Sequence, residues 1–148
     1  MHTIIVRRTV AASPEAMYDL LIDPVTYRQF PGVSLAELVR PGVHEQLGVG
    51  AVRRIHISVF RYDEEILAAD RGREFSYRVV ASRPRLEHEL GTVRFEPVAD
   101  GCEVTWTTRY RVPVPVFGPV MARLGGLRMR RAFEDSIRLS AQLAPLDG

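Results

Sequence analysis

The feature that most constrains the fold is a long stretch near the C-terminus, Val112–Ala144. After Pro119 it contains no proline until Pro145, and it is rich in alanine, leucine, methionine and arginine. These residues favour helix, and the absence of proline removes the strongest helix breaker. We therefore expect one long helix, and the rest of the chain must pack against it.

Drawn at 100° per residue, this helix has two apolar arcs, rotated by about a third of a turn from each other. The change of face falls at Gly125-Gly126, where helix propensity is weakest, so we expect the helix to bend or restart there. The first arc contains Phe117, Val120, Met121, Leu124 and Leu127, and the second contains Met129, Ala132, Phe133, Ser136, Ser140 and Leu143.

The segments before the helix alternate between apolar and polar residues, as half-buried strands do. The clearest case is Cys102–Val112, where Trp106, Thr108 and Tyr110 share one side with Val104 and Val112. In the same way Phe75 and Tyr77 share one side of an earlier strand. The turns at Arg71-Gly72 and Asp100-Gly101 predict hairpins.

The predicted order is strand, two short helices, six strands and long helix. Ser13 is the expected N-cap of the first short helix, Asp23-Pro24 ends it, and the second spans residues 25–30. Successive strands joined by short turns indicate an antiparallel sheet, hence an α+β fold. The predicted strands are Thr3–Val10, Val33–Arg40, Ala51–Phe60, Arg61–Asp70, Arg73–Val80, Leu86–Pro97 and Cys102–Val112.

Length and composition predict a single domain over residues 1–148, of a soluble and cytoplasmic kind. The chain is 46% hydrophobic and 26% charged, and no apolar run approaches the ~20 residues of a transmembrane segment. A net charge of +2 argues against nucleic acid as a partner. One cysteine, Cys102, excludes an intrachain disulfide and a multi-cysteine metal site. We expect neither a metal nor a cofactor, since no metal or nucleotide motif is present.

All twenty basic residues are arginine, which excludes a Schiff-base lysine and a lysine-containing phosphate loop. Seven of these arginines lie between Arg109 and Arg138, against two acids, Glu134 and Asp135. Such a cluster is most often a solvated face. The alternative is weak contact with anionic lipid or an acidic partner.

The order of elements resembles the helix-grip fold of the START/Bet v 1-like (SRPBCC) superfamily, and within it the bacterial polyketide cyclase/dehydrase and lipid-transport group. The segments that carry the resemblance are Val6–Glu15 running into Met17–Leu21, Asp23-Pro24 with Tyr27, Gly48–Arg53, Gly91–Phe95, Val104–Trp106 and the closing helix. The resemblance implies a curved antiparallel sheet wrapped around the C-terminal helix, with the two short helices at one end. It also implies a mostly apolar cavity for lipids, polyketides or similar molecules.

If that cavity exists, its walls would be aromatic and apolar with a few hydroxyl groups. The alternative is an ordinary core in which Tyr and Trp satisfy their polar tips locally. The residues expected to bind ligand are Phe75, Tyr77, Trp106, Thr108 and Tyr110 from the strands, and Phe117, Met121, Leu124, Met129 and Phe133 from the helix.

Acid–base chemistry has three candidates, His88, Tyr77 and Tyr110. His88 faces the interior if Gly91 marks a bulge in its strand, and is otherwise an ordinary surface or satisfied histidine. Arg8 shares the parity of the apolar residues of the first strand. It either extends to solvent at the strand end or is buried against a carboxylate, for which Glu64, Glu65, Glu87 and Glu89 are available.

Three functions follow. The first is binding of a hydrophobic small molecule, as a carrier or sensor. The second is an enzyme of the cyclase/dehydratase type, a lyase or isomerase without metal or nucleotide, in which a pocket His or Tyr moves a proton. The third is a regulator similar to the coenzyme-Q-binding or ribosome-associating members of the superfamily, which the segment Tyr27–Gly32 loosely resembles.

Overall fold

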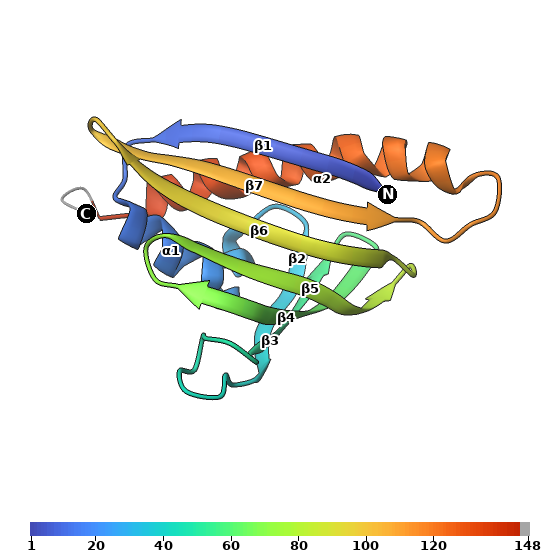
Figure 1. Ribbon diagram of the computed structural model, residues 1–148, viewed down its shortest axis with the longest axis horizontal. Coiled ribbons are helices and arrows are strands. Elements are labelled where there is room, and N and C mark those ends of the chain that lie inside the picture. Colours follow the sequence, from blue (N-terminus) through green and yellow to red (C-terminus); the bar gives the residue numbers. More distant parts are fainter. Residues whose placement is uncertain (146–148) are drawn as a thin grey trace.

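The structure, a computed structural model, describes residues 1–145 of the chain. Within these residues, seven strands form one antiparallel sheet in the order β1-β7-β6-β5-β4-β3-β2. β1 and β2 are thus the two edge strands of this sheet, and Figure 1 shows β1 beside β7. The strands are β1 (His2–Val10), β2 (Val33–Arg40), β3 (Val52–Ile57), β4 (Phe60–Asp70), β5 (Glu74–Arg83), β6 (Glu87–Val98) and β7 (Gly101–Arg111).

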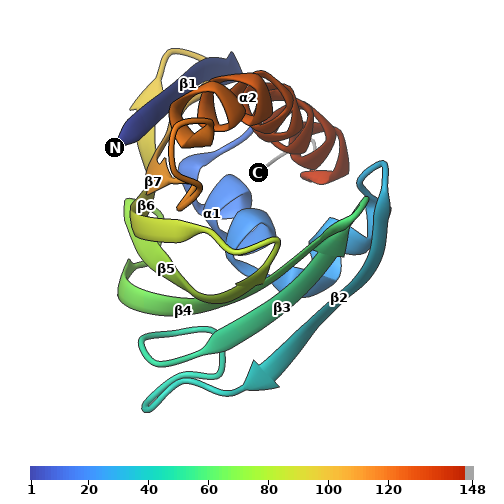
Figure 2. The same ribbon diagram turned by 90° about the vertical axis from the view of Figure 1, so that its right-hand side faces the viewer.

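Two short helices follow β1, as the sequence predicts. In α1 (Pro14–Ile22) the hydroxyl of Ser13 accepts a hydrogen bond from the Ala16 N–H at 3.1 Å, which satisfies one of the free amides of the first turn. Asp23 caps the 3₁₀ helix η1 (Pro24–Gln29) in a similar way. α1 buries Met17 and Leu21 completely. These helices fill one end of the curved sheet (Figure 2).

The long helix α2 (Gly118–Leu143) packs against β1, β7 and α1. Figure 2 shows the sheet curving away from it toward β3 and β2. This arrangement is the helix-grip fold that the sequence predicts, with an antiparallel sheet and a long C-terminal helix.

The core alternates along the strands as expected. Cys102, Val104, Trp106, Thr108 and Tyr110 are all buried on one side of β7, and the residues between them are more exposed. β1 pairs with β7 along its whole length, so that Val6 lies opposite Trp106. The boundary between β3 and β4 differs from the prediction, because Ser58 has a φ of 54° and the chain turns there.

The first half of α2 corrects the sequence analysis. The helix continues through Gly125-Gly126 without restarting. Its first apolar arc is exposed, because the opposite side, with Gly118, Ala122 and Gly126, packs on the sheet. Small residues allow this close approach: a Cβ on Gly126 would lie 3.0 Å from the Tyr110 hydroxyl oxygen. The exposed fractions are 65% for Phe117, 56% for Val120, 47% for Met121, 62% for Leu124 and 66% for Leu127.

The second arc packs largely as predicted. Ser136 and Ser140 are buried, Met129 and Phe133 are half-buried, and Leu143 is exposed. The ring of Phe133 lies parallel to that of Trp106, with centroids 4.2 Å apart. None of the helices in the described residues is long and apolar enough to cross a membrane.

Candidate functional site

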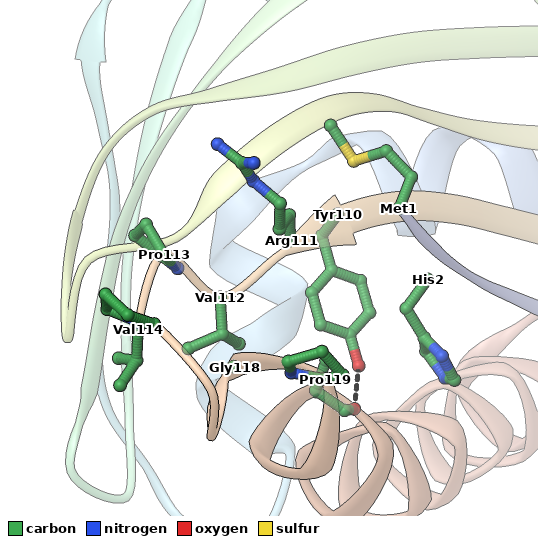
Figure 3. A pocket seen from close by; sticks show the side chains of 11 residues that line it. Met1, His2, Tyr110, Arg111, Val112, Pro113, Val114, Gly118 and Pro119 are labelled. Carbon is green, nitrogen blue, oxygen red and sulfur yellow. Dashed lines mark hydrogen bonds between the residues drawn. The ribbon is translucent and has the colours of Figure 1, made fainter.

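A cavity of about 530 Å³ opens at the end of the molecule where β1 begins and β7 ends (Figure 3). The β7–α2 loop and the first turns of α2 close it on the other side. Its walls are mainly apolar. The residues that line it are Met1, His2, Tyr110, Arg111, Val112, Pro113, Val114, Pro115, Gly118, Pro119 and Ala122.

Two polar side chains of this cavity, Tyr110 and Arg111, already have partners. The Tyr110 hydroxyl donates a hydrogen bond to the Ala122 carbonyl of α2, as Figure 3 shows. Burial raises the pKa of Tyr110, so the phenol keeps its proton at neutral pH. The ring of His2 stands edge-on to that of Tyr110 at 5.5 Å, and Arg111 is paired with Glu87. Among the ligand-binding residues predicted from sequence, Tyr110 is the one that lines this cavity.

A second group of predicted residues lies deeper, between β5, β6 and β7. Trp106 Nε1 donates to the Tyr77 hydroxyl at 2.9 Å, and both side chains are buried. His88 Nε2 lies 2.6 Å from Thr108 Oγ1, and the His88 ring stacks on Tyr77 with centroids 5.5 Å apart. Phe75 is fully buried beside Tyr77. The structure therefore brings the strand residues of the prediction together.

His88 faces the interior because β6 has an irregularity just before Gly91, the residue at which the sequence analysis allowed a bulge. The register with β7 shifts between His88 and Leu90. Gly91 follows at once, and its lack of a side chain makes room for the Tyr77 ring, which a Cβ there would overlap. The bulge inverts the parity of the strand, so that His88 and Val93 both point inward.

The protonation state of His88 follows from its partners. Nδ1 accepts a hydrogen bond from the Val79 N–H at 3.0 Å, so the neutral ring carries its proton on Nε2 and donates it to Thr108. Burial, together with the charge of Arg78, lowers the pKa of His88 to about 4. Burial also raises the pKa of Tyr77 far above its usual value. At neutral pH this group is uncharged and internally hydrogen-bonded.

Sequence reasoning missed the most buried charge of the molecule, Arg53 on β3. It is 1% exposed, and its Nη1 donates to the carbonyls of Leu21 and Ile22 at 2.9 and 3.2 Å. Its Nη2 lies 3.4 Å from Glu64. Three rings surround the guanidinium, those of Tyr27, Phe75 and Tyr77. A signal was present, because Arg53 shares the parity of the apolar residues Ala51 and Ile55.

The ion pair between Arg53 and Glu64 bears on Arg8, for which the sequence analysis offered Glu64 as a possible partner. Glu64 belongs to Arg53, and Arg8 is exposed, with its Nη1 3.9 Å from Glu134 of α2. Arg8 thus extends to solvent at the end of β1, which was one of the two alternatives.

Comparison with models of protein families shows which family the chain belongs to. The model of the family described as polyketide cyclase / dehydrase and lipid transport matches residues 1–142. The chain belongs to this family. A search of curated proteins found no match.

Solved structures share the fold at low sequence identity. A START superfamily protein from Mycobacterium smegmatis has a TM-score of 0.77 at 14% identity, over 97% of this chain and 100% of that one. A protein from Thermus thermophilus has a TM-score of 0.74 at 20% identity, over 95% and 94%. Norcoclaurine synthase from Thalictrum flavum, solved with dopamine and hydroxybenzaldehyde, has a TM-score of 0.68 at 20% identity, over 96% and 85%.

Proposed function

We propose that this family member is a carrier or sensor that binds a hydrophobic small molecule in the cavity between β1, β7 and α2. The observation that carries the proposal is the cavity itself. Its volume of about 530 Å³ lies within the range of about 300–1,000 Å³ of small-molecule sites. Its walls are mainly valine, proline, alanine and methionine, with Tyr110, His2 and the Glu87-paired Arg111 as sparse polar groups.

The hydrogen bonding of the interior favours binding over catalysis. Both ring nitrogens of His88 are engaged, and the hydroxyl groups of Tyr77 and Tyr110 have protein partners. A general acid or base must be within reach of the substrate, with a pKa near the working pH. His88, with a pKa of about 4, stays neutral at pH 7.

The test begins with native mass spectrometry of the freshly purified protein, followed by solvent extraction and identification of any bound compound. Saturable binding of the apolar dye anilinonaphthalene sulfonate is then measured. Val114→Phe adds bulk to the wall of the cavity and is expected to weaken binding about tenfold. Val43→Phe is the control, because Val43 is 74% exposed and does not line the cavity. The proposal is wrong if no compound is extracted and dye binding does not saturate.

A cyclase or dehydratase reaction is the second candidate, and one observation favours it: His88 points inward beside Tyr77 and Thr108. The same fold in norcoclaurine synthase holds dopamine and hydroxybenzaldehyde, so the scaffold admits small reactive aromatics. The compound identified by extraction is the substrate to test. His88→Phe should abolish turnover and leave binding intact; turnover that survives this substitution excludes His88 as the catalyst.

A further inference from the structure

The first half of α2 and the two residues before it present a continuous apolar surface to solvent. This surface, here named the α2 apolar face, is formed by six side chains that are between 47% and 85% exposed: Val116, Phe117, Val120, Met121, Leu124 and Leu127. Single exposed apolar residues are ordinary, but a contiguous row of large ones marks an interaction surface. Because Gly118, Ala122 and Gly126 occupy the opposite side of the helix, this row contributes little to the core.

The α2 apolar face adjoins the mouth of the cavity. Val114, Pro115 and Pro119 line the cavity, and Val116 and Phe117 lie between them in the chain. Figure 1 shows the β7–α2 loop at one extreme of the molecule, leading directly into α2. A partner that covers the face therefore also covers the entrance.

Val116 has an unusual backbone for such an exposed position. Its φ is 69°, a left-handed conformation that β-branched residues rarely adopt. The side chain is 85% exposed, so burial in the protein does not compensate this strain. Strain of this kind is typical of segments whose geometry serves an interaction.

The charged residues next to the α2 apolar face are all positive. From Val104 to Phe133 the chain contains six arginines and no acidic residue. Among residues 1–145, Arg123, Arg128 and Arg131 of α2 are exposed and have no carboxylate within 4.0 Å. At 100° per residue, Arg128 and Arg131 continue the α2 apolar face along the same side of the helix. An apolar row bordered by cations is the pattern of a helix that lies in a membrane surface.

We propose that the first half of α2 lies in the surface of a membrane that contains anionic lipid. The α2 apolar face enters the boundary between headgroups and acyl chains, and Arg123, Arg128 and Arg131 contact the lipid phosphates. Docking in this way places the mouth of the cavity at the bilayer, so that a hydrophobic ligand passes between the two without crossing water. This last consequence rests on the proposed function; the docking itself does not.

A membrane fits the face better than a second copy of the chain does. A symmetric dimer through this surface places the same arginines of both copies in one interface, and like charges there oppose association. An anionic bilayer supplies the opposite charge over the whole length of the face. A dimer is therefore the competing result of the test.

The test is flotation of the full chain with vesicles of phosphatidylglycerol and phosphatidylcholine in equal parts, compared with phosphatidylcholine alone. We expect the protein to bind the anionic vesicles, and we expect this binding to weaken as salt is added. Val120→Gln with Leu127→Gln should lower partitioning at least about tenfold, because two apolar side chains no longer enter the bilayer. Arg128→Gln with Arg131→Gln should lower it about tenfold through lost attraction to lipid phosphate.

Val43→Gln with Val59→Gln is the matched control, since both valines are 74% exposed and lie outside α2. It should float like the wild type. The proposal is overturned if the wild type does not float, or if all variants float equally. A dimer would overturn it as well. In that case sedimentation shows a dimeric wild type that becomes monomeric in the variant Val120→Gln with Leu127→Gln, and the wild type does not bind vesicles. Dye binding by the wild type separates the two proposals: if the wild type binds dye but does not float, the docking proposal alone has failed; if it floats but binds no dye, the cavity proposal has failed.

Discussion

The guanidinium of Arg53 and the carboxylate of Glu64 lie 3.4 Å apart on neighbouring strands, in a part of the core almost closed to solvent. The guanidinium also donates hydrogen bonds to two backbone carbonyls at the end of α1 and to the hydroxyl of Tyr27. Burial raises the pKa of Glu64, and the charge of Arg53 opposes that rise. Arg53 thus ties α1 to the middle of the sheet through charge-assisted hydrogen bonds.

Removing either member of this pair should destabilise the fold strongly. Glu64→Leu leaves a buried cation without its anion, and we expect a loss of about 3–5 kcal/mol in the free energy of unfolding. Arg53→Met with Glu64→Leu should cost less than the sum of the single changes. Urea unfolding of the four proteins of this cycle measures the coupling.

The neighbouring pair Arg54–Asp63 is the control, because it joins the same two strands but its arginine is 40% exposed. Arg54→Met should shift the midpoint of urea unfolding far less than Arg53→Met does, since solvent screens an exposed ion pair. Equal shifts for the two arginines would show that burial does not set the importance of Arg53.

The pH dependence of stability should report His88. Its pKa is lowered from 6.5 to about 4 in the folded chain, by burial and by Arg78. Between these values the unfolded chain binds the proton and the folded chain does not. Stability from this residue is therefore complete above about pH 6.5 and declines as the pH falls toward 4, by at most about 1.4 kcal/mol per pH unit. Urea unfolding at several pH values measures the slope.

His88→Gln should flatten that slope over the same window. The carboxylates titrate equally in both proteins, so the difference between the two curves isolates the histidine. Parallel curves for wild type and variant would mean that His88 is as solvated in the folded chain as in the unfolded one.

The sheet could be predicted from the sequence because period-two alternation is a local signal. Trp106, Thr108 and Tyr110 follow it along β7. For His88, the glycine three residues later made the inward orientation one of two alternatives, which the sequence alone did not decide. Arg53 was harder. Its parity was readable, but its partner Glu64 is on the next strand, and a strand register is set by pairing that neither strand encodes alone.

The two faces of α2 show a second limit of prediction from sequence. A helical wheel groups apolar residues, but it does not tell which group meets the sheet. Here Gly118 and Gly126 allow a closer approach than Phe117 or Leu124 would, so the small residues pack and the large ones face solvent. The cavity accordingly has Gly118 and Ala122 in its wall beside Tyr110, and no residue of the first predicted arc.

Gly125 and Gly126 should respond in opposite directions to the same substitution. A Cβ on Gly125 meets nothing within 4 Å, so Gly125→Ala gains helix propensity without a clash, about 0.5–1 kcal/mol. A Cβ on Gly126 lies 3.0 Å from both His2 and Tyr110, so Gly126→Ala must displace the helix or those rings. Thermal unfolding should show a higher Tm for the first variant and a lower one for the second. A higher Tm for both would refute the close packing of α2 on Tyr110.

The stack of Phe133 on Trp106 should hold the second half of α2 to the sheet. The rings are parallel within 6° at 4.2 Å, and Trp106 is 3% exposed. Phe133→Ala removes this cover, and we expect a loss of about 2–4 kcal/mol because Phe133 is only half-buried. Trp106 is the single tryptophan, so its emission reports the change directly and should shift to longer wavelength as water reaches the indole. Leu127→Ala on the same helix is the control, with less than about 0.5 kcal/mol expected at 66% exposure. An unchanged emission maximum in Phe133→Ala would mean that other side chains keep water from Trp106 without this ring.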